Sequence, residues 1–534
     1  MNSLTIRGNR IYPLLLSLLA LLAFATVLYV RIRLFDTPLE RDEGEYAYMA
    51  QLLLKGVPPY KHAYTMKLPG VPLVYALFMS IFGQSAAGIR IGLLLTNAAC
   101  AGFVYLLGRR LFTHETALIA AVFYAFLSLS QSVMGIFAHA THFVLLFSLA
   151  GMILLDYALK KKQSSLIFPA GICFGMSFLM KQHAAVLVPF AVVFQIWPSD
   201  KGNRKLLLRN CASFLTAAAA PYIIVAFWLF KAGVFDRFWF WTVRYAREYA
   251  TGLSLTAGFN EFAQQFTPII RANLPIWFLA AAGLVALYGR SDFRAEKLFL
   301  SGYLTASMVM VSQGLYFREH YFVLLLPAIA ILAAYAAQAV KPLLSGFSGS
   351  LLPLLIVASA AVFFISSESA YLFRLSQVEV SRKIYGTNPF PEAIRIADYI
   401  KEHTSTQDRI AILGSEPEIL FYAGRLSATG HIYMYGLMEG HRYAWEMQAQ
   451  VIEEIEQAAP LFIVVVHNSA SWMLRPSSLN RILDWGDSYI PLRYDEVGII
   501  EIFGERPTSY LWDEAAVGHT PETESFVSVY RRRW

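Results

Sequence analysis

Residues 11–30 read IYPLLLSLLALLAFATVLYV, an apolar run that follows Arg7 and Arg10. A helix of about 20 such residues is roughly 30 Å long, which matches the thickness of a bilayer core. The run resembles a signal peptide, but it is long enough to span a membrane and no small-residue cleavage site follows it. We therefore predict an uncleaved first membrane helix.

The rest of the chain repeats this apolar character. Of its 534 residues, 57% are hydrophobic and only 15% are charged, whereas about a quarter are charged in a typical soluble protein. The apolar blocks predict about eleven transmembrane helices. They cover residues 11–30, 86–107, 115–132, 141–158, 165–180, 183–198, 211–230, 268–288, 297–314, 319–338 and 349–367. The shorter run 70–83 predicts an interfacial or re-entrant helix.

Lysine and arginine in the loops set the orientation of these helices. If the N-terminus is cytoplasmic, every predicted inside loop is basic, as the positive-inside rule requires. The residues concerned are Arg109, Arg110, Lys160, Lys161, Lys162, Lys201, Arg204, Lys205, Arg209, Arg290, Arg294, Lys297 and Lys341. The same orientation places 31–85, 232–267 and everything after about residue 368 outside. The net charge of +7 therefore reflects membrane orientation and gives no reason to expect a nucleic-acid partner.

The sequence changes character after residue 367, where charged residues become frequent and apolar runs shorten. Residues 391–403 and 441–457 have helical patterns, and 409–413 and 461–466 are β-branched runs typical of buried strands. This alternation predicts a small α/β domain. The predicted fold is a polytopic α-helical membrane protein, with a transmembrane domain at 1–367 and an extracytoplasmic α/β domain at 368–534.

The first outside loop contains many polar and aromatic side chains. Residues 38–70 read PLERDEGEYAYMAQLLLKGVPPYKHAYTMKLPG. A helix starting near Arg41 would place Asp42, Glu45, Tyr46 and Met49 on one face. A carboxylate at the membrane surface suits a general base acting on a hydroxyl. An acid in the first helical turn is equally typical of a helix cap.

Several stretches together resemble the GT-C superfamily of lipid-linked glycosyltransferases. The resemblance is closest to the bacterial branch related to protein O-mannosyltransferases, the lipid A aminoarabinose transferase and Rgt-type transferases. The stretches are RDEGEYAYMAQLLLKG, MKLPG, GQSAAGIRIGLLLTNAACAGFVYLLGRRLF, FPAGICFGMSFLMKQHAAVLVP, FREHYFVLLLP and GSEPEILFYAGR. Together they are distributed over most of the chain.

This resemblance implies an enzyme that moves a sugar from a polyprenyl phosphate to an envelope glycan, lipid or protein. The reaction would take place on the outer face of a bacterial cytoplasmic membrane. The family's catalytic acid matches Asp42, with Glu43 beside it, and would activate the acceptor hydroxyl. Direct displacement would invert the anomeric configuration. The departing phosphate is already anionic, so it needs cations and not an acid.

Two lysines are candidates for binding the donor phosphate. Lys67 matches a family lysine, and Lys181 lies at the predicted outer end of a span, against the positive-inside trend. A lysine at a span end also reaches the interface without any catalytic role. Tyr46, Tyr64 and Tyr321 match or approach family tyrosines near the phosphate, although interfacial aromatic residues are common in membrane proteins.

Some positions depart from the family pattern. Glu45 stands where some relatives carry arginine, and Met66 replaces an acid proposed as a metal ligand, so the resemblance does not imply a metal here. In AHATHF, His139 and His142 have the i, i+3 spacing that would suit a divalent metal. The same two histidines could instead orient an acceptor, or they could be polar residues at the end of a span without a role in the site.

Arg244 and Tyr245 lie in a later outside loop and are candidates for sugar or phosphate binding, although their spacing does not decide it. Two other classes of function stay open. One is a transporter or flippase of lipid-linked saccharides, and the other is a non-catalytic envelope-assembly protein. Transporters usually have ionisable residues near mid-span, whereas the predicted spans here are mostly apolar at that depth.

Overall fold

The computed structural model describes residues 3–196, 204–343 and 346–533. Lys201 and residues 197–198 of the predicted span 183–198 lie outside the described residues. The chain forms two compact units. Unit 1 contains Met1–Phe35, Arg90–Val225 and Ala250–Arg374, and unit 2 contains Asp36–Ile89, Ala226–Tyr249 and Leu375–Trp534. Residues 36–85 of the predicted outside loop 31–85 therefore group with the C-terminal segment.

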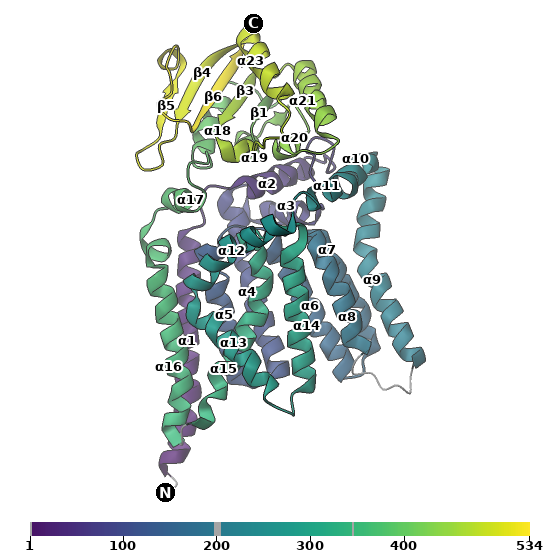
Figure 1. Ribbon diagram of the computed structural model, residues 1–534, viewed down its shortest axis with the longest axis vertical. Coiled ribbons are helices and arrows are strands. Elements are labelled where there is room, and N and C mark those ends of the chain that lie inside the picture. The colour runs from purple at the N-terminus through teal and green to yellow at the C-terminus, as the bar shows by residue number, and fades with distance from the viewer. Residues whose placement is uncertain (1–2, 197–203, 344–345, 534) are drawn as a thin grey trace. The chain divides into compact units, whose positions relative to one another are not determined.

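Unit 1 is a bundle of apolar helices, and its long helices run side by side in Figure 1. The helices that lie wholly or mostly in unit 1 are α1 (Ser3–Arg33), α4 (Ala86–Leu111), α5 (His114–Leu127), α6 (Ala140–Lys160), α7 (Ile167–Met180), α8 (Leu187–Ile196), α9 (Arg204–Lys231), α12 (Leu255–Ala272), α13 (Leu274–Tyr288), α14 (Arg294–Ser312), α15 (Leu326–Ala339) and α16 (Gly346–Ser367). Short 3-10 segments join some of them, including η3 (Gln182–Val186) and η6 (Glu319–Leu325).

These helices agree with a multi-pass membrane protein. In the part of the chain that the structure describes, each of the eleven predicted spans lies wholly or partly on helices. Among the described residues, six helices are long and apolar enough to cross a membrane, or seven if a bent pair counts as one span. That pair is α12 and α13, which meet at 99° and interrupt the predicted span 268–288. The number of crossings therefore stays a prediction.

Two arginines fix the end of α1, immediately before the first outside loop. Arg31 donates to the carbonyl oxygens of Gly135 at 3.1 Å and Ser128 at 3.0 Å. Arg33 donates to the carbonyl oxygen of Leu372 at 3.0 Å. Hydrogen bonds from charged groups contribute more than neutral ones, typically about 1.5–3 kcal/mol each. They hold the C-terminal end of α1 against the rest of unit 1.

Unit 2 contains the remaining helices and a six-stranded sheet (Figure 1). Its helices are α2 (Arg41–Leu54), α3 (Gly70–Phe82), α10 (Phe235–Trp239), α11 (Ala246–Ala250), α17 (Gln377–Tyr385), α18 (Glu392–Glu402), α19 (Pro417–Ala423), α20 (Tyr435–Met438), α21 (Ala444–Ala458), α22 (Ser469–Trp472) and α23 (Arg481–Arg493). Its strands are β1 (Arg409–Leu413), β2 (Leu426–Ser427), β3 (Phe462–His467), β4 (Tyr494–Glu501), β5 (Ser509–Trp512) and β6 (Phe526–Arg532).

The sheet has the order β2-β1-β3-β6-β4-β5. β1 pairs in parallel with β2 and β3, and the remaining pairs are antiparallel. The prediction of a C-terminal α/β segment is confirmed. Strand β1 coincides with the predicted run 409–413, and β3 differs from 461–466 by one residue at each end. The predicted helices 391–403 and 441–457 correspond to α18 and α21.

A glycine allows α2 to pack closely against α19 of the C-terminal segment. A Cβ atom at residue 44 would lie 2.6 Å from the backbone nitrogen of Glu418, so a larger side chain than that of Gly44 would force the two helices apart. The packing brings the first turn of α2 against the segment 414–418. The candidate base is in this first turn.

Candidate active site

Helix α2 begins with a capping box made by two glutamates. The Glu40 carboxylate accepts from the backbone N–H of Glu43 at 2.8 Å, and the Glu43 carboxylate accepts from the backbone N–H of Glu40 at 3.4 Å. Such a box satisfies two N–H groups that the helix leaves open. Glu40, and not Asp42, therefore provides the side-chain cap. Glu43 is fully buried within this box.

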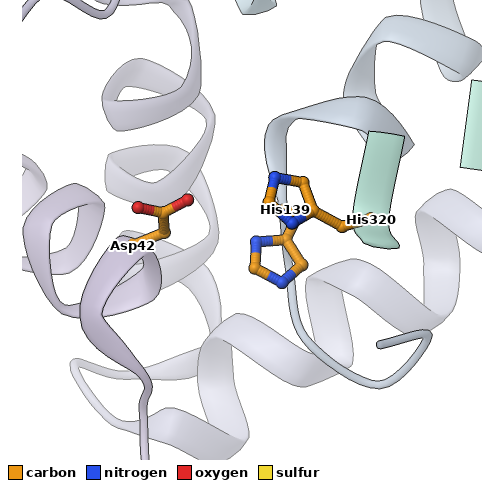
Figure 2. Close-up of side chains that lie close together, drawn as sticks. All are labelled: Asp42, His139 and His320. Carbon is orange, nitrogen blue, oxygen red and sulfur yellow. The ribbon is translucent and has the colours of Figure 1, made fainter. Parts of the chain in front are cut away.

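Asp42 lies in the first turn of α2 and is one of the side chains drawn in Figure 2. Its Oδ1 atom accepts from the Lys67 ammonium at 2.7 Å and from the Tyr433 hydroxyl at 3.0 Å. Lys67 also donates to Glu45 Oε2 at 2.5 Å. The Asp42 cluster, as we call Asp42, Glu45, Lys67 and Tyr433, joins the loop to the C-terminal segment within unit 2.

The charges in this cluster support one another. Burial disfavours the Lys67 ammonium, but the Asp42 and Glu45 carboxylates outweigh it and raise the pKa of Lys67 well above its usual value. Burial, with the nearby Asp42 charge, also raises the pKa of Tyr433. Lys67 therefore stays charged and Tyr433 stays protonated at neutral pH, so both act as donors to Asp42.

Tyr46 forms one side of the cluster. The Lys67 ammonium lies 4.6 Å from the centre of the Tyr46 ring, and that ring meets Tyr75 edge-on at 5.6 Å. Since Lys67 touches Asp42, Glu45 and Tyr46, the prediction that these three share one face of the helix is confirmed. A role of Lys67 or Tyr46 in phosphate binding stays a prediction.

Arg41 holds the start of α2 against the C-terminal segment. Its guanidinium donates to the carbonyl oxygen of Ser415 at 2.6 Å, to Asn388 Oδ1 at 2.9 Å and to Glu416 Oε1 at 2.8 Å. A further N–H donates to the Tyr435 hydroxyl at 2.6 Å. The planar fork of arginine suits several acceptors at once. Ser415 and Glu416 belong to the stretch GSEPEILFYAGR, which was identified only by its resemblance to the family. This stretch therefore helps to fix the helix that carries Asp42.

Glu418 lies beside this contact and is fully buried. Neither of its carboxylate oxygens has a hydrogen-bond partner among the described residues. Burial, together with the nearby Glu416 charge, raises the pKa of Glu418 well above its usual value of 4.5. Burial likewise raises the pKa of Glu40, with Asp42 and Glu43 adding to the effect. The surroundings of Glu40 and Glu418 therefore favour the protonated form of both acids.

Tyr64 and Tyr245 pack against the C-terminal segment. The Tyr64 hydroxyl donates to Glu454 at 3.0 Å, and its ring stacks on Trp241 at 5.8 Å. The Tyr245 hydroxyl donates to Glu439 at 2.9 Å. These contacts give both tyrosines a packing role and do not bring them into the Asp42 cluster. Arg244 is exposed next to them, so the predicted sugar or phosphate contact of this pair stays a prediction.

A second group of predicted residues comes together in unit 1. Lys181 lies in extended backbone at the break between α7 and η3, and its ammonium is 3.8 Å from the centre of the Tyr321 ring. His183 meets the Tyr321 ring edge-on at 5.1 Å, and His320 does so at 4.8 Å. The resemblance suggested Lys181 and Tyr321 for the same phosphate site, and the structure places them in direct contact.

His139 and His320 stack face to face in unit 1, with ring centres 4.0 Å apart and ring planes 13° apart (Figure 2). His139 precedes α6, whereas His142 is buried in its first turn. Neither ring nitrogen of His142 has a hydrogen-bond partner among the described residues. A role of His139 and His142 in binding a metal or an acceptor stays a prediction.

Three contributors escaped the sequence-based prediction. Tyr433 lies in a C-terminal stretch without any recognised pattern. Glu45 was placed on the shared face of the helix and noted as a departure from the family, but no role was predicted for it. His320 was quoted in FREHYFVLLLP without a role. The shared face of α2 was the one signal that pointed to Glu45.

Comparison with known proteins supports the fold and the family resemblance. Residues 61–230 match the family model described as dolichyl-phosphate-mannose-protein mannosyltransferase, a range that includes Lys67 and Lys181 but not Asp42. A search of curated proteins finds no match.

Solved structures match nearly the whole chain. ArnT from Cupriavidus metallidurans bound to undecaprenyl phosphate has 14% identity and a TM-score of 0.62, covering 96% of this chain and 97% of ArnT. The oligosaccharyltransferase of Archaeoglobus fulgidus tethered with an acceptor peptide has 14% identity and a TM-score of 0.54, covering 94% and 74%. AglB from that organism, in complex with an inhibitory peptide and a dolichol-phosphate, has 13% identity and a TM-score of 0.52, covering 94% and 74%.

The predicted resemblance to the GT-C superfamily is therefore confirmed. The chain has the fold of these membrane transferases, including the C-terminal segment that carries the sheet.

Proposed function

We propose that this chain is a membrane glycosyltransferase that moves a sugar from a polyprenyl-phosphate donor to an envelope acceptor. The family match over 61–230 and the fold shared with ArnT support this class. The observation that carries the proposal is the Asp42 carboxylate, which Lys67 and Tyr433 hold at the start of α2. A fixed carboxylate between two donors is suited to removing a proton from a bound hydroxyl.

Asp42 acts as the general base in this proposal. It removes the proton from the acceptor hydroxyl while the acceptor oxygen attacks the anomeric carbon of the donor. The bond between that carbon and the phosphate oxygen breaks, and its electron pair leaves with the polyprenyl phosphate. A single displacement of this kind inverts the anomeric configuration. Lys67 and Tyr433 hold Asp42 in the orientation needed for the proton transfer.

Lys181 assists the leaving group. The polyprenyl phosphate departs as an anion, so a fixed cation stabilises the charge that develops during bond breaking. The Lys181 ammonium lies 3.8 Å from the centre of the Tyr321 ring, and this contact orients the lysine side chain. His183 and His320, which border the same ring, limit its movement. In this assignment Lys181 binds donor phosphate, and Lys67 chiefly serves Asp42.

The reaction takes place on the outer face of a bacterial cytoplasmic membrane. The basic loops that support a cytoplasmic N-terminus also place residues 31–85 and the segment 368–534 outside. The transmembrane part, 1–367, would accept the lipid donor from the bilayer. The acceptor would be a glycan, lipid or protein of the envelope.

A reconstituted reaction tests this proposal. The full chain in detergent is given undecaprenyl phosphate carrying mannose, glucose or aminoarabinose, together with an envelope extract from cells that lack the protein. Mass spectrometry measures free undecaprenyl phosphate and the masses of the extracted acceptors. We expect a loss of donor matched by an acceptor gain of one sugar. A flippase would give neither change, because detergent removes the two sides of the membrane.

Cells that lack the protein provide the complementary measurement. One class of envelope molecule should lose one sugar in mass, and the complementing gene should restore it. If all envelope masses and the pool of lipid-linked sugar are unchanged, the proposed function is wrong.

A further inference from the structure

Tyr433 reaches the Asp42 cluster from a distant part of the sequence. Its hydroxyl donates to Asp42 Oδ1 at 3.0 Å across 391 positions of sequence. It lies between β2 and α20, in the C-terminal segment. The same carboxylate oxygen accepts from Lys67 at 2.7 Å. One oxygen of the candidate base is therefore held by a charged donor from its own loop and by a neutral donor from the C-terminal segment.

Neighbouring residues hold both the backbone next to Tyr433 and the Tyr433 ring. The backbone N–H of Met434 donates to Ser415 Oγ at 2.9 Å. The Tyr433 ring meets the Tyr435 ring edge-on at 4.9 Å, and the Tyr435 hydroxyl donates to the carbonyl oxygen of Ala470 at 2.6 Å. Arg41 donates to that same hydroxyl at 2.6 Å. The backbone next to Tyr433 and the Tyr433 ring are thus held by contacts within the C-terminal segment.

The two donors to Asp42 differ in what they can do. Lys67 divides its ammonium between Asp42 and Glu45, so its position depends on both carboxylates. Tyr433 adds a hydrogen bond without adding charge. A neutral donor can orient a carboxylate while leaving the charge balance of Asp42, Glu45 and Lys67 unchanged. Orientation and charge are therefore supplied by different residues.

We propose that Tyr433 is a positioning residue for the base Asp42 and gives the C-terminal segment a direct part in the transfer step. This inference rests on the proposed function. Tyr433 holds the Asp42 carboxylate in the orientation that accepts the acceptor proton. The C-terminal segment is then required for turnover as well as for any recognition of the acceptor.

The substitution Tyr433→Phe tests the inference, since it removes the hydroxyl and keeps the ring. We expect kcat, measured as release of undecaprenyl phosphate from the donors named above, to fall about 10-fold to 100-fold, as for the loss of a hydrogen bond to a charged group. The KM values for donor and acceptor should stay within about twofold. The matched control is Tyr399→Phe, which removes the hydrogen bond from Tyr399 to Asp513 (2.7 Å) in the same segment and should leave kcat unchanged.

A second measurement does not depend on substrate. Dicyclohexylcarbodiimide reacts with protonated carboxyl groups, and mass spectrometry of the Asp42 peptide measures the labelled fraction. Loss of a donor to the carboxylate favours its protonated form, so Tyr433→Phe should raise labelling of Asp42 severalfold and Tyr399→Phe should not. Unchanged labelling, an unchanged kcat or a raised KM at constant kcat would each overturn the inference.

The two proposals can fail separately. If Asp42→Asn keeps wild-type turnover, the proposed base is wrong, whatever Tyr433→Phe does. If Asp42→Asn is inactive while Tyr433→Phe turns over normally, only the role of Tyr433 is wrong.

Discussion

The Asp42 cluster of unit 2 and the Lys181 group of unit 1 use lysine in different ways. Lys67 is bonded to two carboxylates, at 2.7 Å and 2.5 Å. Lys181 lies against the face of Tyr321 at 3.8 Å, with His183 and His320 around the same ring. A lysine that is hydrogen-bonded to carboxylates tunes those acids, whereas contact with the face of an aromatic ring orients the lysine side chain. In the proposed mechanism the base belongs to the first group, and the cation that binds the leaving phosphate belongs to the second.

The largest effect that separates the two lysines should come from Lys67→Met. Without the ammonium, Asp42 and Glu45 become two neighbouring acids, and one of them takes up a proton. We expect kcat to fall about 100-fold to 1,000-fold, within the range of general-base contributions, with little change in the KM for donor. The exposed pair of Lys401 and Asp398 gives the control, Lys401→Met.

Adding Glu45→Gln to Lys67→Met should restore part of the activity, because it removes the second negative charge. A raised donor KM in Lys67→Met, with kcat kept, would instead assign Lys67 to the phosphate.

Lys181→Ala should give the opposite kinetic result. Loss of a charged contact to phosphate typically costs about 1.5–3 kcal/mol, so the KM for the polyprenyl-phosphate donor should rise about 10-fold to 100-fold. The acceptor KM should not change. Lys160→Ala is the control, since Lys160 pairs with Asp156 at 3.1 Å and is about half exposed. Initial rates over a range of donor concentrations measure the donor KM. An unchanged donor KM would show that the donor phosphate does not bind at Lys181.

The smallest effect concerns stability and its pH dependence at Glu418. Because burial raises its pKa above 4.5 in the folded chain, the stability linked to Glu418 is full below about pH 4.5 and falls as pH rises through the raised value. Glutamine cannot ionise, so Glu418→Gln should be about 1–2 kcal/mol more stable than wild type near pH 8, and the difference should vanish below about pH 4.5.

Thermal unfolding of the full chain in detergent at several pH values measures this difference. Glu453→Gln, at an exposed position, should follow the wild-type curve. Identical pH slopes for Glu418→Gln and wild type would show that Glu418 is not a buried neutral acid.

Sequence patterns predicted those parts of the fold that depend on local periodicity. The β-branched run 409–413 became β1, and the apolar blocks became helices, because burial of such runs dominates their energetics. Strands β4 and β6 were not predicted, since they are rich in charged residues and owe their pairing to partners far along the chain. The bend of 99° between α12 and α13 also escaped prediction.

The residues of the site could likewise be predicted only where their arrangement depends on local helix geometry. The spacing of Asp42, Glu45 and Tyr46 on α2 gave their shared face, because helical geometry is local. Helix capping by Glu40 was missed, and Asp42 was considered for that role. Tyr433 could not be predicted, since its contact with Asp42 exists only after the C-terminal segment has folded against α2.

The rate of sugar transfer by Asp42→Asn tests the central claim most directly. The variant keeps the size of the side chain and its place in α2, and carboxyl labelling and membrane insertion report whether the rest of the cluster is intact. Asp398→Asn, an exposed acid of the same unit, is the control. We predict that Asp42→Asn transfers sugar at least about 1,000-fold more slowly than wild type and still binds undecaprenyl phosphate. Transfer within tenfold of wild type would contradict the assignment of Asp42 as the base.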